Sequence, residues 1–210
     1  MYLPPHFEET RPTELHRIIA EHSLGTMVTT GPQGLDANHL PFLLEPTAGE
    51  HGRLLAHVAR ANPVWTEAKT GDDVLVIFRG AEAYVSPNWY PSKHEAHRQV
   101  PTWNYQVVHV HGRIVIHDNE RFVRGVVARL TRTHEAAANP DAPWQMGDAP
   151  TDYLDRMLAA IVGIEIEITR IEGKSKLSQN REGRDRDTAA AELDVRGEME
   201  LSAAMRNAHK

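Results

Sequence analysis

The segment VGIEIEITRIEG, residues 162–173, decides the fold class because it alternates apolar and polar residues with unusual regularity. Val162, Ile164, Ile166 and Ile168 fall on one face of an extended chain, and two of the intervening residues on the other face are glutamates. A period of two residues is typical of a strand with one buried face and one polar face. The segment therefore predicts a half-buried β-strand.

Further runs of strand composition precede this segment, and most are bounded by turn residues. They are LGTMVTT (24–30), LDANHLPFLLE (35–45), RLLAHVA (53–59), DDVLVIFRG (72–80), EAYVS (82–86) and YQVVHVHGRIVIH (105–117). The GPQG turn between the first two indicates a hairpin. Gly112, in the last run, is expected at a bulge or where two backbones approach closely.

Helical spacing appears between the strands. The segments are RPTELHRIIAEH (11–22), RANPVWTEA (60–68), NERFVRGVVARLTRTHEA (119–136) and DYLDRMLAAIV (152–162). Asp118 is the expected cap of the third segment. In the fourth, the residues expected to point inward are Tyr153, Leu154, Met157, Leu158 and Ile161.

Six or seven strands with helices at the start, middle and end favour an antiparallel barrel with peripheral helices over a doubly wound parallel sheet.

Composition limits the possible functions. A chain of 210 residues suits one domain, and the absence of cysteine excludes disulfides, thiolate metal sites and a cysteine nucleophile. The net charge of −6 argues against a large nucleic-acid footprint. Without a long apolar run or a signal-peptide pattern, we expect a soluble, cytoplasmic protein that does not enter a membrane.

The tail differs in composition from the rest. Residues 187–210 are charged and rich in alanine, with only a weak helical pattern. We therefore expect one domain over residues 1–186, followed by a tail that is partly disordered or forms a marginal helix.

The stretch YVSPNWYPSKHEAHRQVPTWNYQVVHVHG, residues 84–112, concentrates aromatic side chains between prolines. Two interpretations remain open: the rings of Trp89, Tyr90, Trp103 and Tyr105 stack on a planar ligand, or they cap a barrel end or a subunit contact. Polar neighbours favour the ligand, since they offer hydroxyl, ammonium and amide groups beside the rings. These neighbours are Ser86, Lys93, Thr102 and Asn104.

Two other kinds of site, a metal site and a nucleophilic active site, have weaker support in the sequence. His109 and His111 share one face of a strand, a geometry that suits zinc or haem iron, but no Asp or Cys stands nearby at ligand spacing. Structural histidines are the favoured interpretation, and we predict no metal. The chain has no G-x-S-x-G elbow and no G-x-G-x-x-G loop, so catalytic residues stay unassigned.

Several motifs together carry a family resemblance. They are MYLPPHF (1–7), ANHLPFLL (37–44), HVARANPVW (57–65), YVSPNWYPSK (84–93), VPTWNYQVVHVHG (100–112), IVGIEIEI (161–168) and GKSKLSQNR (173–181). In this order they resemble the PaiB family, described as FMN-binding negative transcriptional regulators of protease production and sporulation genes. That family is similar to FMN-binding split barrels such as pyridoxamine phosphate oxidases. The resemblance implies a six-stranded antiparallel split barrel and a homodimer with FMN at the subunit interface.

The resemblance also implies roles near the start of the second helical segment. Arg60 would bind the FMN phosphate, with Asn62 and His57 beside it, because arginine and exposed helix amides suit a phosphate. The alternative is that Arg60 pairs with a surface carboxylate. Asn38 lies on a strand that could meet the pyrimidine edge of the flavin, and the alternative is an ordinary core strand.

Two further groups complete the predicted contacts. Trp103 or Trp89 could cover the flavin ring, and Lys93 could reach the phosphate or a second ligand. After the last strand, split barrels often send a C-terminal segment across the partner's flavin, and the residues predicted for this contact are Lys176, Ser178, Gln179 and Asn180. A solvated basic turn is the alternative for that segment.

Three functions follow from these features. The leading one is a regulator or sensor of the PaiB type. The second is a flavin-dependent oxidoreductase that passes hydride between NAD(P)H and a small substrate. The third is a barrel that holds haem or another planar ligand. Fold alone does not separate them. Direct DNA contact is doubtful, because the sequence contains no convincing helix-turn-helix motif.

Overall fold

The computed structural model describes residues 1–208, which form two compact units. Unit 1 comprises residues 1–21, 79–109 and the described part of 172–210. Unit 2 comprises residues 22–78 and 110–171. Three long strands contribute residues to both units.

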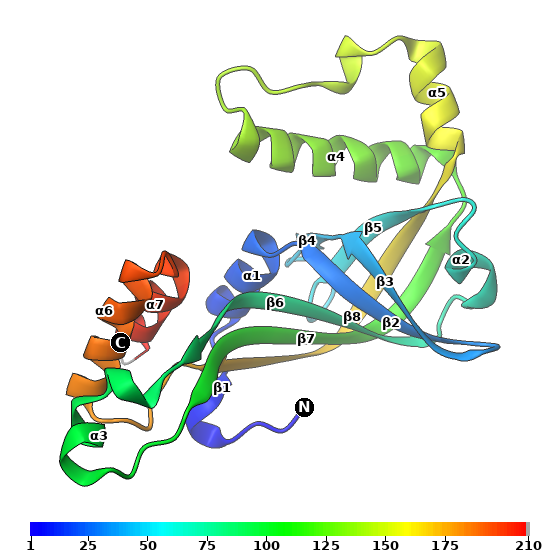
Figure 1. Cartoon of the computed structure of the whole chain (residues 1–210). Coiled ribbons are helices and arrows are strands. Elements are labelled where there is room, and N and C mark those ends of the chain that lie inside the picture. Colours follow the sequence, from blue (N-terminus) through cyan, green and yellow to red (C-terminus); the bar gives the residue numbers. More distant parts are fainter. Residues whose placement is uncertain (209–210) are drawn as a thin grey trace. The chain divides into compact units, whose positions relative to one another are not determined.

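Strands and helices follow one another along the chain as labelled in Figure 1. The first nine elements are η1 (Pro5–Phe7), β1 (Glu8–Glu9), α1 (Pro12–Glu21), β2 (Leu24–Gly31), β3 (Gly34–Pro41), β4 (Leu43–Glu45), β5 (Arg53–Ala59), α2 (Val64–Glu67) and β6 (Asp73–Val85). The remaining elements are η2 (Pro87–Trp89), α3 (Pro91–Ala96), β7 (Thr102–His117), α4 (Glu120–Ala138), η3 (Met146–Asp148), α5 (Thr151–Ala159), β8 (Ile161–Lys176), α6 (Gly183–Val195) and α7 (Met199–Asn207).

The strands form one eight-stranded sheet in the order β3-β2-β6-β7-β8-β5-β4, with β1 paired to β8. Neighbours such as β2 and β3, or β5 and β8, run antiparallel. This architecture confirms the predicted α+β class with an antiparallel sheet. The expected count of six is corrected to eight, and the sheet is not closed. The runs at 72–80 and 82–86 join into β6, whereas β1 and β4 are too short to show a period.

The predicted strand at residues 162–173 is part of β8. Val162, Ile164 and Ile166 are fully buried in unit 2. Gly112 confirms the expected close approach, because a Cβ there would lie 2.5 Å from the backbone oxygen of Glu167. β7 and β8 therefore pass each other at a distance that only glycine allows at this position.

Two helix details in unit 2 differ from expectation. Asn119, rather than Asp118, caps α4: its Oδ1 accepts a hydrogen bond from the Phe122 amide at 2.9 Å. In α5, Tyr153 and Met157 are 47% and 46% exposed, so their predicted inward orientation is wrong. Leu158 is the buried residue of α5, because this short helix covers its unit with one narrow face.

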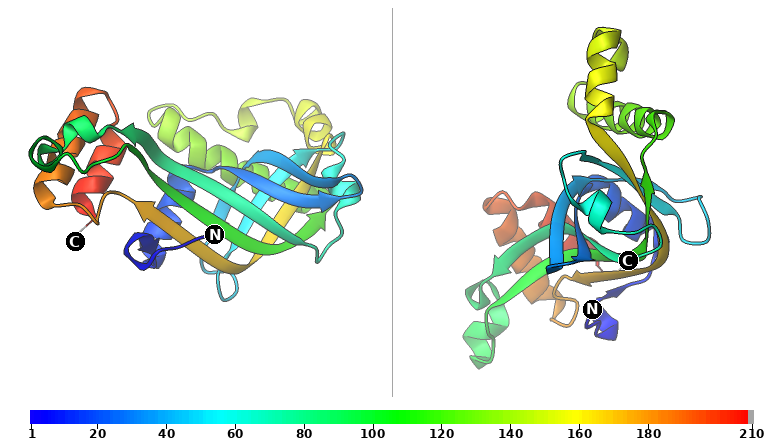
Figure 2. Two further views of the ribbon diagram at one scale, coloured as in Figure 1. Left: turned by 60° about the horizontal axis from the view of Figure 1, so that its bottom comes forward. Right: turned by 90° about the vertical axis from the view of Figure 1, so that its right-hand side faces the viewer.

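Unit 1 contains a core to which the C-terminal helices contribute. α6 and α7 lie side by side (Figure 2) and bury alanine and leucine side chains against β6, η2 and the segment after β8. The cluster comprises Ala83, Val85, Tyr90, Leu177, Ala189, Ala190, Leu193, Leu201 and Met205. The sequence suggested partial disorder or a marginal helix here, since small alanine contacts produce little amphipathic pattern. The described part of this segment instead contains two packed helices.

α1 follows its prediction, with Leu15, Ile18 and Ile19 buried. Within residues 1–208, no helix has the length and apolar character required to cross a membrane.

Candidate functional site

The end of β5 and the start of α2 bring predicted residues together in unit 2. Asn62 Nδ2 donates a hydrogen bond to Asn38 Oδ1 at 2.6 Å. Asn62 Oδ1 accepts from the Val64 amide at 2.9 Å, which holds the side chain at the start of the helix. The amides of β3 and of the β5–α2 turn thus form one polar surface.

Arg60 lies in the same turn and has several partners. Its two terminal nitrogens contact Asp118 at 2.6 and 3.0 Å, and Nε donates to the Ala159 carbonyl at 2.8 Å. The guanidinium also stands 5.5 Å from the Trp65 ring centre, a cation–π distance. The hydrogen bond from Arg60 holds the pKa of Asp118 below its usual value. This carboxylate pairing is the alternative that the sequence left open for Arg60.

His57, on β5, has an unusual environment. Its Nδ1 is buried and has no hydrogen-bond partner among the described residues. Burial lowers the pKa of the imidazole, which favours the neutral ring. An unpartnered buried nitrogen is costly, so a bound group that pairs with it would relieve a real deficit.

A polar network near the start of α4 was missed by the sequence analysis. Glu165 is buried, and its two oxygens contact Arg53 Nη1 at 3.1 Å and His117 Nε2 at 3.0 Å. The His117 ring stacks on Phe122 with centroids 3.7 Å apart. These residues are far apart in the sequence and share no motif. The alternating pattern of β8 had assigned Glu165 to the polar face of the strand and gave no signal of its burial.

Three arginines line a hollow of about 530 Å³ beside this network. Arg53 and Arg129 both pair with Glu45. Arg121 is exposed, and its side chain has no polar partner among the described residues. Unit 2 therefore has one uncommitted guanidinium in this hollow.

In unit 1, Lys176 is held in place by its neighbours. Its ammonium donates to the Thr102 hydroxyl and to the Trp103 carbonyl. Burial lowers the pKa of Lys176, and the charges of Lys174 and Arg181 lower it further. Trp103 is 55% exposed, so its ring is available to a ligand or partner.

Asn104 and Ser178 also come together, but inside unit 1. Asn104 Nδ2 donates to Ser178 Oγ at 2.9 Å and to Met205 Sδ at 3.4 Å. Asn104 and Ser178 are 1% and 4% exposed, and Tyr90 is fully buried beside them. This arrangement is a polar link within the core of the unit.

Three other predicted contacts have local structural partners. Ser86 caps η2 by accepting a hydrogen bond from the Asn88 amide at 3.2 Å. The Trp89 ring lies 4.8 Å from the guanidinium carbon of Arg196. Gln179 Nε2 donates to the Ser175 carbonyl at 2.5 Å, which braces the turn after β8.

The remaining two residues predicted to contact FMN have no polar partner among the described residues. The side chains of Lys93 and Asn180 make no hydrogen bond or ion pair within residues 1–208, and Asn180 is exposed. Of the predicted residues, four lie in unit 2 and ten in unit 1.

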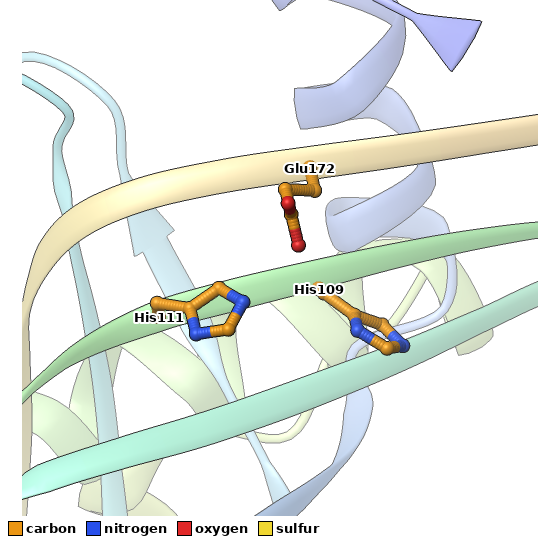
Figure 3. Close-up of side chains that lie close together, drawn as sticks. All are labelled: His109, His111 and Glu172. Atoms are coloured by element: carbon orange, nitrogen blue, oxygen red, sulfur yellow. The ribbon is translucent and has the colours of Figure 1, made fainter. Parts of the chain in front are cut away.

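The histidines of β7 show what the fold adds to a sequence motif. In unit 1, a ring nitrogen of His109 lies within 4.8 Å of a Glu172 carboxylate oxygen, and Figure 3 shows both side chains with His111 two residues along the strand. Glu172 also accepts a hydrogen bond from the Met1 ammonium at 3.0 Å. Because this ammonium already neutralises the carboxylate, the arrangement does not favour a metal ion.

Comparison with known sequences gives a consistent result. A family model described as "Putative FMN-binding domain" matches residues 1–170. The chain is 34% identical over 181 residues to the protease synthase and sporulation protein PAI 2 of Bacillus subtilis (strain 168), which covers 86% of this chain and 83% of the relative. It is 30% identical over 220 residues to an uncharacterized protein of Emericella nidulans, with 89% and 88% covered.

Solved structures share the fold at low sequence identity. The flavocytochrome Anf3 from Azotobacter vinelandii has a TM-score of 0.59 at 11% identity and covers 87% of this chain and 73% of its own. The FAD and heme binding protein from Mycobacterium smegmatis has a TM-score of 0.57 at 15% identity, with 80% and 73% covered. At these identities the likeness concerns the fold alone.

Proposed function

Because the chain belongs to the FMN-binding domain family matched over residues 1–170, we propose that it is a split-barrel FMN protein of the PaiB type that acts as a regulator or sensor. FMN is its cofactor. The observation that carries the regulatory role is the 34% identity to the Bacillus subtilis protease synthase and sporulation protein over 86% of this chain.

The residues near the end of β5 suit the polar parts of FMN. Arg60 supplies a cation for the phosphate, and Asn62 and Asn38 supply amide groups. The buried His57 Nδ1 lacks a hydrogen-bond partner among the described residues, so a donor or acceptor of the bound flavin would satisfy it. When bound, FMN supplies a ring that accepts and releases electrons or hydride.

In our proposal, Asp118 competes with the FMN phosphate for Arg60. It already occupies both terminal nitrogens of Arg60, so a phosphate must share or displace that carboxylate. The two side chains are 40% and 48% exposed, which leaves the pair accessible to a ligand. Binding of the phosphate is therefore a competition between two anions for one guanidinium.

We further propose a homodimer in the cytoplasm. The split-barrel resemblance implies FMN at a subunit interface, and β3 is an edge strand on which Leu35 is 80% exposed. An exposed edge strand with an apolar residue suits burial against a second copy. A chain without cysteine is compatible with a reducing compartment. Sedimentation velocity with and without FMN tests the dimer.

Fluorescence titration of FMN tests the phosphate site. Arg60→Ala should weaken binding by about 1.5–3 kcal/mol, the value of a lost charge-assisted hydrogen bond. Asp118→Asn should strengthen binding, because it removes the competing anion while preserving the side-chain shape. Arg121→Ala is the control, since it removes an exposed arginine of the same unit and should leave the affinity unchanged.

Each outcome has a distinct meaning. Unchanged affinity in Arg60→Ala would mean that this residue only pairs with Asp118, and the phosphate site would have to be sought elsewhere. Failure of the wild type to bind FMN would overturn the proposal. Steady NAD(P)H consumption that depends on FMN would favour the oxidoreductase over the sensor.

A further inference from the structure

A cavity of about 850 Å³ lies entirely within unit 1. Its walls come from the N-terminal arm, α1, β7, the end of β8 with the following turn, and α7. Gln179 is the single lining residue that belongs to the predicted FMN contacts. The volume is large enough for a small organic ligand.

The most buried polar side chain of this cavity has an oxygen that receives no hydrogen bond from the described residues. Gln106 is 3% exposed, and its Nε2 donates to Ser175 Oγ at 3.0 Å and to Glu14 Oε1 at 3.3 Å. The Gln106 Oε1 atom is buried without a partner among the described residues. Flipping the amide would place its oxygen against the Glu14 carboxylate, so the present orientation is favoured. Gln106, a lining residue of the cavity, thus carries a buried acceptor that no donor satisfies.

Charge around the cavity is predominantly negative. Its charged lining residues are Glu8, Glu9, Glu14, Glu200, Arg11 and Arg17. The two arginines are committed: Arg11 forms two hydrogen bonds to Glu9, at 2.6 and 2.9 Å, and Arg17 contacts Glu14 at 2.8 Å. Glu8 has no side-chain partner within residues 1–208. A cation in this cavity therefore meets the carboxylate of Glu8, which no arginine of the described residues neutralises.

Small apolar residues form another part of the wall, beside Glu200 and Asn207 of α7. Ala203 and Ala204 of α7, Ala208 directly after this helix, and Leu177 form this part of the wall. Methyl side chains on this helix leave space that larger residues would fill. The wall is therefore suited to a short hydrocarbon or aromatic body rather than to a fully hydrated ion.

We propose that this cavity binds a small organic cation with an ammonium or amidinium head and a short apolar body. The head lies among the carboxylates and donates to Gln106 Oε1, and the body packs on the alanines of α7. An anion of the same shape is excluded by the glutamates, and a neutral analogue lacks the electrostatic attraction. The proposal is independent of FMN binding, because every residue it uses is in unit 1 and none holds the proposed phosphate site.

Calorimetric titration with three molecules of matched shape tests the charge requirement. The probes are 2-phenylethylamine, 2-phenylethanol and phenylacetate. The amine should bind about 10- to 100-fold more tightly than the alcohol, as expected for charge-assisted hydrogen bonds, and phenylacetate should not bind. Equal affinity for the amine and the alcohol, or binding of phenylacetate, would overturn the proposal.

Two pairs of variants locate the site. Ala203→Phe fills the cavity from an exposed position and should abolish amine binding, whereas Ala191→Phe, at an exposed position of α6 outside the cavity, should not. Glu8→Gln should weaken the binding of 2-phenylethylamine and leave the affinity for 2-phenylethanol unchanged. Glu198→Gln is its control. Circular dichroism of each variant verifies folding.

Titration of the amine into FMN-saturated protein separates the two sites. If FMN stays bound and the amine binds with its normal affinity, the cavity is separate from the flavin site. Release of FMN by the amine, or full amine binding to Ala203→Phe, would contradict the proposal while leaving the flavin function intact. The absence of amine binding to a wild type that still binds FMN would also refute it.

Discussion

Single residues of unit 2 take their chemistry from partners that are distant in the chain. Arg60 is a phosphate ligand or an ion-pair partner depending on whether Asp118 keeps its terminal nitrogens. Glu165 is buried, and Arg53 and His117 both contact its carboxyl group. Such pairs arise from packing, so the residue type alone does not reveal them.

His57 provides a test at the residue scale. Burial depresses its folded-state pKa below the usual value of 6.5. The unfolded chain therefore binds the proton more readily, and the stability due to neutral His57 is complete above about pH 6.5 and is lost as the pH falls through that value. Urea unfolding near pH 8 and near pH 5 should show a smaller loss for His57→Gln than for the wild type.

His134→Gln is the control for that experiment, since His134 is exposed on α4 in the same unit. It should retain the wild-type pH dependence. An equal loss of stability in His57→Gln and the wild type would indicate that the ring is protonated without cost in the folded state.

At the scale of elements, backbone spacing and small residues determine how strands and helices pack. β7 approaches β8 at Gly112 closely enough to exclude any side chain. α6 and α7 are held by alanines and leucines although their polarity pattern is weak. Both cases depend on residues whose lack of bulk is the useful property.

Two glycines should respond in opposite directions to the same substitution. Gly112→Ala should lower the free energy of unfolding by about 1–3 kcal/mol, because the new methyl group meets the Glu167 backbone and the Ile166 side chain. Gly125→Ala, at an exposed position of α4 where a Cβ would meet no atom within 4 Å, should raise the free energy of unfolding by about 0.5–1 kcal/mol. Chemical denaturation measures both. Tolerance of alanine at position 112 would contradict the close approach.

At the scale of the whole molecule, the balance of charge limits the possible partners. The net charge is −6, and Arg181, before α6, and Arg184, within it, are already engaged in unit 1. Arg184 pairs with Glu95 at 2.6 and 2.7 Å, and Arg181 contacts Gln99 at 2.5 Å. These basic side chains do not form a free phosphate-binding surface.

We therefore expect no binding of the pure protein to duplex DNA at physiological salt. An electrophoretic shift assay with promoter and random fragments, repeated at several salt concentrations, measures this. Arg184→Ala should make no difference. A shift of promoter DNA whose affinity falls steeply with salt would contradict the expectation and indicate direct phosphate contacts.

Much of the fold could be read from local patterns. The alternation in β8, the helical spacing of α1 and α4, and the family motifs predicted the antiparallel sheet and FMN. The short strand β1 could not be predicted, because two residues show no period, and the predicted strand at 35–45 is divided into β3 and β4. The cavity in unit 1 was also missed, although Asn104 and Gln106 occupy buried positions of β7 where apolar residues are usual.

The sequence by itself determined the class of fold, the family and its cofactor, because these depend on periodicity and on motifs that are continuous in the chain. Only the tertiary structure decided that Arg60 meets Asp118, that Asn104 and Ser178 are buried, and that Gln106 has an oxygen without a donor. The physical reason is that hydrogen bonds, ion pairs and burial join residues that stand many positions apart, 101 in the case of Asn104 and Met205, and no local pattern encodes those contacts.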